Sequence, residues 1–277
     1  MYDYYFSEKK KIKKNPENFI LFVKKLLPKS CNSFPDSQII RIFRYLKKNK
    51  INNMIETGTG SSTICFFMYA YLYKKKIYSF DIDQNKLSIV RQVINDSICK
   101  PLNINLYDYW ISVNSDSTSK YSGIACLKEK KEIFDFLFLD SEHTHEHVLK
   151  EFNSFLELNL KKYTLVLDDS YMKYIKYNNA YINNIRLKLG LNKIQIKNNL
   201  SKNTCAQVVE NFLKSKDNKF KKEKNIELKR VKNDIYFQYF GADIKYSYET
   251  TGKNFILDLT KSEKSDLINR VSIYKVF

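Results

Sequence analysis

Short apolar runs alternate with helical stretches through the middle of the chain, and this alternation constrains the fold more than any other feature. Five runs are candidate strands, namely residues 54–55, 77–80, 111–113, 134–139 and 164–167. Three stretches between them carry apolar residues at helical spacing, namely 63–73, 84–98 and 145–158. Alternating strands and helices build βαβ units, so we predict an α/β fold with a doubly wound, mostly parallel sheet.

Polar residues follow these candidate strands at the point where each one ends. Glu56, Asp81, Asp140 and Asp168 directly follow four of the five runs, and Asn114 follows the remaining one. In open α/β sheets, ligands bind outside the carboxyl ends of the strands. We therefore expect the functional site at this edge of the sheet.

Residues 1–48 are predicted to form an N-terminal helical lid or flank. Apolar residues recur at helical spacing between 19 and 27, and Pro28 then ends the helix. The helical pattern returns near residue 36, where Asp36 or Ser37 can serve as the N-cap.

Residues 49–277 are predicted to be the functional core, which includes the elements that close the sheet. A helix is expected at 205–213, after a helix-like segment that begins near residue 178. The lysine-rich stretch 214–224 is expected to be a surface loop. Closing strands are predicted at 226–231, 235–240 and 254–259.

The composition describes a globular protein with a strongly basic charge. The formal net charge is +18, but lysines are spread along the whole chain, as an AT-rich coding bias produces. Charge of this kind affects solubility and steering rather than the reaction, so we expect no nucleic-acid partner. The five cysteines form no close pair and no metal-ligand spacing, which indicates free thiols in a reducing compartment. The absence of a signal-peptide pattern and of a long apolar run favours a cytoplasmic protein without membrane insertion.

A first group of site candidates follows the first two candidate strands. Gly58 and Gly60 permit a tight turn and a close approach of a ligand to the backbone before a helix begins. Asp81 ends the next strand, where a carboxylate can accept both hydroxyls of a ribose. Asp83, close by, is expected to be a solvated residue at a helix start. Asp116, after the third strand, can accept from an adenine amine or can be a turn residue.

A second group follows the fourth and fifth candidate strands. Asp140, Asp168 and Asp169 lie at the ends of two strands that should be neighbours. Carboxylate oxygens on rigid strand ends suit a hard cation such as Mg²⁺, and a cation gives a physical reason for clustering acids. All three histidines of the chain lie within 143–147, next to these acids. The alternative is a helix start, with Ser141 or Thr144 as its cap.

The first group resembles the class I S-adenosylmethionine-dependent methyltransferases. The resemblance rests on Glu56-x-Gly58-x-Gly60 and on Asp81 after the second strand. A dehydrogenase of the Rossmann type usually has a third glycine, at the position where this chain has Thr63. The resemblance implies a Rossmann-like sheet and S-adenosylmethionine as cofactor, held by both glycines and Asp81. It also implies that Glu56 supports the loop and can reach toward the methionine amino group.

The second group resembles metal-dependent O-methyltransferases of the catechol, macrolide-sugar and rhamnosyl types, and the family described as cephalosporin hydroxylase-like. This resemblance covers residues 50–175. It implies that Asp140, Asp168 and Asp169 bind Mg²⁺ or Mn²⁺ and that His143 is the general base. The implied reaction is O-methyl transfer to a small molecule or saccharide, such as a surface polysaccharide or natural-product sugar. Because family members often form dimers or larger assemblies, the resemblance also implies a homo-oligomer.

Two departures leave the acceptor open. Ser141 stands where related sequences often have glycine, and residues 170–174 match no acceptor signature. Two rivals also stay open: an RNA methyltransferase, which would use clustered basic residues, and a nucleotide-binding module without catalysis. The roles of His145 and His147 are not assigned by the sequence.

Overall fold

We describe the protein from a computed structural model, which places residues 9–130, 132–158, 160, 162–170, 173, 201–223 and 271–277. The closing strands expected at 226–231, 235–240 and 254–259 lie outside these described residues. The same is true of most of the helix-like segment expected after residue 178. Everything from the first to the fifth candidate strand, apart from residues 131, 159 and 161, lies inside them.

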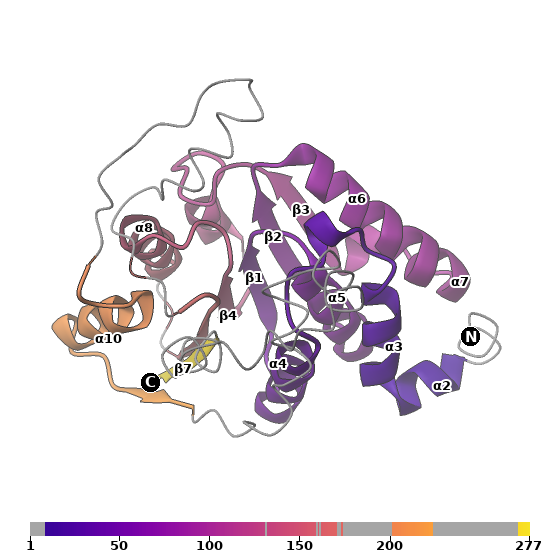
Figure 1. Cartoon of the computed structure of the whole chain (residues 1–277), viewed down its shortest axis with the longest axis horizontal. Coiled ribbons are helices and arrows are strands. Elements are labelled where there is room, and N and C mark those ends of the chain that lie inside the picture. The colour runs from indigo at the N-terminus through magenta and orange to yellow at the C-terminus, as the bar shows by residue number, and fades with distance from the viewer. Residues whose placement is uncertain are drawn as a thin grey trace, which may run out of the picture.

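The described residues form a seven-stranded sheet in the order β3-β2-β1-β4-β5-β7-β6 (Figure 1). Strands β1 to β5 are parallel, and β7 runs antiparallel to both β5 and β6. The predicted α/β class with a mostly parallel, Rossmann-like sheet is confirmed. The strands span Asn53–Thr57 (β1), Ile77–Asp81 (β2), Trp110–Asn114 (β3), Phe134–Leu139 (β4), Tyr163–Leu167 (β5), Phe220–Lys222 (β6) and Ser272–Val276 (β7).

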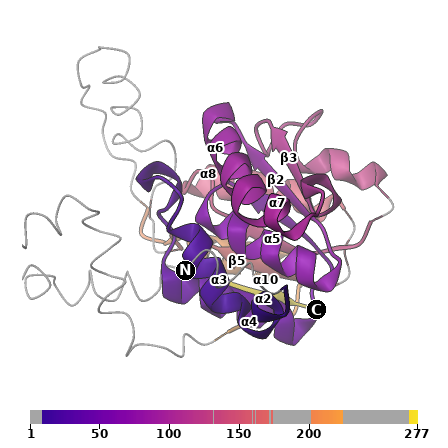
Figure 2. The same cartoon turned by 90° about the vertical axis from the view of Figure 1, so that its right-hand side faces the viewer.

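Helices cover both faces of this sheet. One layer holds α3, α4, α5 and α6, and the other holds α8 and α10, as the two sides of the sheet in Figure 1 show. Figure 2 is turned so that the first layer faces the viewer. The helices span Lys9–Lys14 (α2), Pro16–Lys24 (α3), Asp36–Asn49 (α4), Ser61–Tyr73 (α5), Gln84–Ile94 (α6), Lys100–Leu102 (α7), His145–Leu156 (α8) and Cys205–Ser215 (α10).

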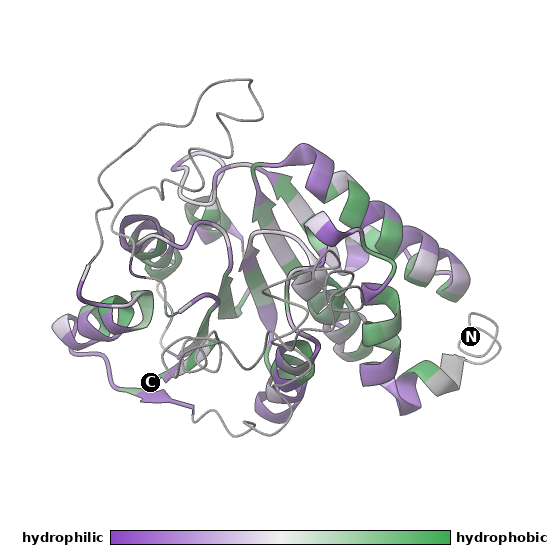
Figure 3. Cartoon of the chain, viewed as in Figure 1, coloured by the Kyte–Doolittle hydropathy of each residue, from purple (hydrophilic) through white to green (hydrophobic). Residues whose placement is uncertain are grey.

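Alternating side chains of the central strands build two separate cores. Met54 of β1 packs into the core under α5, while its neighbour Ile55 packs into the core under α8. Phe138 and Leu139 of β4 divide in the same way. Because both faces of a parallel sheet are buried, its strands are apolar on both sides; Figure 3 shows this as green strands between helices of mixed colour. This burial explains why the strands could be found as continuous apolar runs.

Two details of the helices differ from the prediction. Helix α4 begins at Asp36 itself, and Pro35 rather than Asp36 or Ser37 holds the N-cap position. Helix α6 ends at Ile94, and the predicted continuation to residue 98 is a π-helical turn, Asn95–Cys99 (η2). The wider turn precedes Pro101, which has no N–H to give to an α-helical hydrogen bond.

The lysine-rich stretch 214–224 is only partly a loop, so this prediction was wrong at both ends: Lys214 and Ser215 are the last residues of α10. Residues Phe220–Lys222 form β6, at the edge of the sheet beside β7. Lys221 and Lys222 are exposed there. An edge strand has one side open to water, and lysines on it discourage pairing with another chain, so the same lysines fit a strand as well as a loop.

Candidate active site

The turn between β1 and α5, residues 58–60, lies directly against the chain that leaves β4. Gly58 has φ of +79°, and a Cβ added to it would lie 1.9 Å from the carbonyl oxygen of Asp140. Only glycine fits both conditions. The Asp140 N–H also donates to the Thr57 carbonyl oxygen at 3.0 Å. The strand order reverses between β1 and β4, so the glycine turn and Asp140 meet at the switch point of the sheet.

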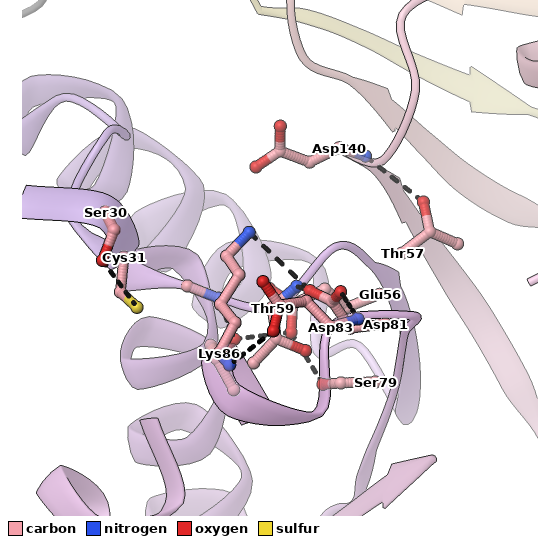
Figure 4. A network of polar contacts seen from close by, with 12 residues as sticks. Ser30, Cys31, Glu56, Thr57, Thr59, Ser79, Asp81, Asp83, Lys86 and Asp140 are labelled. Atoms are coloured by element: carbon pink, nitrogen blue, oxygen red, sulfur yellow. Dashed lines mark hydrogen bonds and ion pairs between the residues drawn. The ribbon is translucent and has the colours of Figure 1, made fainter. Parts of the chain in front are cut away.

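Glu56 is fully buried below this turn. Its Oε1 accepts from Ser62 Oγ at 2.6 Å, and its Oε2 accepts from Thr63 Oγ1 at 2.8 Å and Ser79 Oγ at 2.7 Å. Burial raises the pKa of Glu56 to about 7, although the three hydroxyls lower it in part. Figure 4 shows the contact between Glu56 and Ser79. The carboxylate therefore joins β1, β2 and α5, and a contact with the methionine part of a cofactor stays a prediction.

Thr63, at the position of the absent third glycine, closes the same turn with its side chain. Its Oγ1 accepts from the Gly60 N–H at 3.0 Å and donates to Glu56. Gly60 itself is extended, and a Cβ there would lie 3.1 Å from the Cys31 carbonyl oxygen. That carbonyl belongs to the 3-10 turn Lys29–Cys31 (η1), so part of the predicted N-terminal lid or flank packs on the glycine turn.

Asp81 ends β2 beside the glycine turn, as expected. Its Oδ2 accepts from the Thr59 N–H at 2.7 Å, and its Oδ1 accepts from the Asp83 N–H at 2.9 Å. Each carboxylate oxygen can accept a further hydrogen bond. Asp83 caps α6 through the N–H groups of Asn85 and Lys86, which confirms its predicted place at a helix start. Lys86 Nζ lies 3.7 Å from Asp81 Oδ2 and was not found from the sequence (Figure 4).

Asp116 is an exposed turn residue after β3. Its Oδ1 accepts from the N–H and the hydroxyl of Thr118, both at 2.8 Å. This is the turn that the sequence left as an alternative to an adenine contact. The turn lies beside the end of β2, where the Ser115 N–H donates to the Asp81 carbonyl oxygen at 3.1 Å.

Asp140 and Asp169, two of the three predicted metal ligands, both lie close to the His143 ring. His143 Nε2 lies 3.6 Å from Asp140 Oδ1 and 3.4 Å from Asp169 Oδ2. All three side chains are partly exposed. Asp169 has φ of +43°, a left-handed conformation that aspartate adopts more readily than most residues. The turn after β5 and the loop after β4 are thus brought together, as the neighbouring strands predicted.

Asp168 is the most buried of the three predicted ligands. It is fully buried, and its N–H donates to the Leu139 carbonyl oxygen at 3.0 Å. Within the described ranges, no group of three or more histidine, cysteine, aspartate or glutamate side chains is arranged as a metal site. The metal site of Asp140, Asp168 and Asp169 stays a prediction, and the described contacts bring Asp140 and Asp169 together around His143.

The other two histidines lie at the start of α8. Thr144 is its N-cap and accepts from the His147 N–H at 3.3 Å, so one of the two predicted caps is confirmed. His145 is buried. His147 Nε2 lies 3.3 Å from Oε1 of the fully buried Glu151. Burial lowers the pKa of His147, but the hydrogen bond and charge of Glu151, and then the charges of Glu142 and Asp116, raise it above its ordinary value.

Residues 55–170 match a family model whose description is "Methyltransferase domain". This part of the chain is a methyltransferase domain. It runs from β1 to the turn after β5, so it contains every predicted site residue. The resemblance to class I methyltransferases is confirmed, and the dehydrogenase alternative is not supported. No curated protein matches the sequence.

Several solved structures are similar to this methyltransferase at low identity. An O-methyltransferase from Bacillus cereus, solved with S-adenosylhomocysteine, is 17% identical with a TM-score of 0.43, covering 75% of this chain and 82% of its own. The Podospora anserina methyltransferase PaMTH1, also solved with S-adenosylhomocysteine, is 12% identical with a TM-score of 0.44, covering 74% and 81%. The MycE methyltransferase of mycinamycin biosynthesis, solved with Mg and S-adenosylhomocysteine, is 16% identical with a TM-score of 0.33, covering 49% and 32%.

Two features of the methyltransferase site were not found from the sequence. The exposed Ile82, between the two carboxylates at the end of β2, offers an apolar surface beside Asp81. Lys86 and Glu151 take part through ion pairs with Asp81 and His147. Helical spacing places His147 and Glu151 four residues apart on one face of α8, but their burial depends on which face the sheet covers.

None of the described helices has the length and apolar character needed to cross a membrane.

Proposed function

We propose that this methyltransferase moves a methyl group from S-adenosylmethionine to a hydroxyl of a small molecule or saccharide, assisted by Mg²⁺ or Mn²⁺. The observation that carries the proposal is the close approach of Gly58 to the Asp140 carbonyl. A Cβ added to Gly58 would lie only 1.9 Å from that carbonyl oxygen. This contact joins a turn suited to a nucleoside cofactor to a loop that carries acids and a histidine. A methyl donor and an activated hydroxyl need this proximity, because positioning supplies much of the acceleration of a transfer reaction.

The residues around the glycine turn fit the cofactor. Gly58 and Gly60 leave room for the cofactor against the backbone, and Asp81 keeps lone pairs for the two ribose hydroxyls. Thr59 Oγ1 is buried at the turn and has no hydrogen-bond partner among the described residues, so a polar group of a ligand would satisfy it. Asp116, next to the end of β2, is assigned to the adenine side. Glu56 is assigned to support of the turn from below.

The acids fit a divalent cation. Mg²⁺ is commonly held by one or two carboxylates together with waters and substrate oxygens, and Asp140 and Asp169 both face the position of His143 Nε2. We keep Asp168 as a third, buried member of this set. When bound, the cation would lower the pKa of a coordinated hydroxyl and orient it.

His143 is the proposed general base. It is partly exposed, and its Nε2 lies 3.6 Å from Asp140 Oδ1 and 3.4 Å from Asp169 Oδ2, close enough for these carboxylates to orient the ring. The proton of the acceptor hydroxyl would pass to His143 Nε2 as the oxygen attacks the methyl carbon. The leaving group is the thioether sulfur of S-adenosylhomocysteine, so charge and atoms balance without another reactant.

The test is methyl transfer from radiolabelled S-adenosylmethionine to a panel of hydroxylated small molecules and saccharides. We expect Asp140→Asn, Asp168→Asn or EDTA to abolish transfer while S-adenosylhomocysteine still binds, because the acids hold the cation rather than the cofactor. Asp96→Asn is the matched control, since Asp96 pairs with Lys100 on the surface at 2.7 Å. Undiminished transfer in EDTA would remove the metal from the proposal.

His143→Ala is a separate test of the base. We expect a lower rate with partial recovery at higher pH, because hydroxide can replace a missing base as its concentration rises. The measurement is the rate of transfer against pH for the wild type and the variant. An unchanged rate at neutral pH would exclude His143 from this role.

A further inference from the structure

Glu151 is a buried carboxylate to which the sequence assigned no role. It lies in the second turn of α8 and is fully buried. Its Oε1 accepts from Ser141 Oγ at 2.6 Å and from Ser117 Oγ, and His147 Nε2 lies 3.3 Å from the same atom. Its Oε2 has no hydrogen-bond partner among the described residues. Oε1 of Glu151 therefore has polar contacts with Ser117, Ser141 and His147, which lie in three different segments of the chain.

The two serines belong to the two loops that the proposed reaction requires. Ser117 follows Asp116 in residues 115–123, which we call the Asp116 loop. Ser141 follows Asp140 in residues 140–144, which we call the Asp140 loop. Ser141 also stands at one of the two positions where the sequence departs from related methyltransferases. The contact with Glu151 gives this departure a physical reason.

Backbone contacts hold each loop next to its serine. In the Asp116 loop, the Ile124 N–H donates to the Ser117 carbonyl oxygen at 2.9 Å. A Cβ on Gly123 would lie 2.4 Å from that same oxygen, so the loop closes tightly around Ser117. In the Asp140 loop, the Asp140 N–H is tied to the Thr57 carbonyl oxygen at 3.0 Å. Each serine therefore lies beside a backbone position that is fixed by its own contacts.

A buried carboxylate strongly favours keeping its donors. Removing water from a carboxylate costs free energy that hydrogen bonds and an opposite charge must offset. Glu151 has two hydroxyl donors, and His147 Nε2 lies 3.3 Å from the same carboxylate oxygen. Because both hydroxyls meet one acceptor atom, the distance between the two loops is limited by the reach of two hydrogen bonds.

We propose that Glu151 is a positioning residue that holds the Asp116 loop and the Asp140 loop at one fixed separation, so that cofactor and acceptor are aligned. This inference rests on the proposed function, since the two loops are assigned to the cofactor and to the acceptor there. It predicts that a substitution in one loop changes the amide hydrogen exchange of the other loop, because Glu151 connects them.

The experiment uses the intact chain and two measurements. Amide hydrogen exchange is followed in peptides that cover residues 115–123 and 140–144, and S-adenosylhomocysteine binding is followed by calorimetry. The variants are Glu151→Gln, Ser141→Ala and Ser117→Ala. Glu157→Gln is the matched control, because it removes a carboxylate from the exposed C-cap of the same helix.

We expect Ser141→Ala to speed exchange in the Asp116 loop, and Ser117→Ala to speed it in the Asp140 loop. A local structural role would change only the loop that carries the substitution. We also expect Ser141→Ala to weaken S-adenosylhomocysteine binding by roughly tenfold, the order that loss of one hydrogen bond to a charged group produces. Glu151→Gln should act on both loops, and Glu157→Gln on neither.

Exchange that changes only in the substituted loop, in both serine variants, would overturn the inference. The serine variants keep this outcome accessible if Glu151→Gln does not fold. A wild-type chain that binds no S-adenosylhomocysteine would instead contradict the proposed function. The exchange measurement needs no ligand, so it still tests the coupling between the loops in that case.

Discussion

Among single residues, Gly58 carries the most demanding backbone position. We expect Gly58→Ala to destabilise the protein by more than about 2 kcal/mol and to abolish cofactor binding, because a side chain at positive φ is strained and collides with backbone. Gly60→Ala is the matched comparison for stability alone, since Gly60 has extended backbone and an added Cβ would lie 3.1 Å from the Cys31 carbonyl oxygen and 4.0 Å from Lys86 Cε. Urea unfolding measures the difference, and equal losses in both variants would contradict this role for Gly58.

Glu56 gives a second prediction for a single residue. Its pKa in the folded state is raised to about 7 from an ordinary value of 4.5, so the folded state keeps a proton that the unfolded state has lost. The contribution of Glu56 to stability is therefore largest below pH 4.5 and falls as pH rises from 4.5 to 7. Glutamine cannot ionise, so the Glu56→Gln variant lacks this loss. We expect its free energy of unfolding to rise by about 2–3 kcal/mol relative to that of the wild type between pH 5 and pH 8. Urea unfolding at both pH values checks this, and a parallel pH dependence of both proteins would contradict it.

Residue patterns predicted the site candidates but not all of their surroundings. The glycines, Asp81, Asp140 and Asp169 were found because strand ends in a parallel sheet lie at one edge. The three hydroxyls around Glu56 and the burial of Asp168 were not found. Both depend on which side chains the folded chain brings together across long distances in the sequence, and no local pattern contains that information.

Among the elements, α8 links pH to stability through His147. The pKa of His147 is raised in the folded state, because Glu151, Glu142 and Asp116 together outweigh the effect of burial. Its stabilising contribution is therefore complete below pH 6.5 and is lost as pH rises through the folded-state pKa. We expect the stability of the wild type relative to His147→Gln to be larger at pH 6 than at pH 9. Urea unfolding measures it, with the surface variant Lys150→Gln as control, and a difference that is constant with pH would contradict it.

The elements that were predicted and those that were not differ in how they are stabilised. Strands β1, β2, β4 and β5 are mostly buried and appear as apolar runs, and α8 and α10 have clear apolar stripes with threonine caps. Strand β7 was not predicted, although Ser272, Ile273, Tyr274 and Val276 are buried. Strand β7 forms by antiparallel pairing with β5 and β6. A short segment of mixed polar and apolar residues does not reveal such a long-range contact.

Across the whole molecule, two regions far apart in the chain share one edge of the sheet. In the proposed function, the glycine turn and Asp81 form the cofactor side, and Asp140, His143 and Asp169 form the acceptor side. The contact between Gly58 and Asp140 joins them at the switch point between β1 and β4. The central claim is therefore one of geometry: the cofactor and the cation share this edge.

A crystal soaked with S-adenosylhomocysteine and Mn²⁺ tests this geometry most directly, because Mn²⁺ can be located by its anomalous scattering. We predict the ribose at Asp81 and an anomalous peak between Asp140 and Asp169, on the side of the glycine turn. The result that would contradict the account is a nucleoside bound away from the glycine turn, or a Mn²⁺ peak that neither Asp140 nor Asp169 contacts.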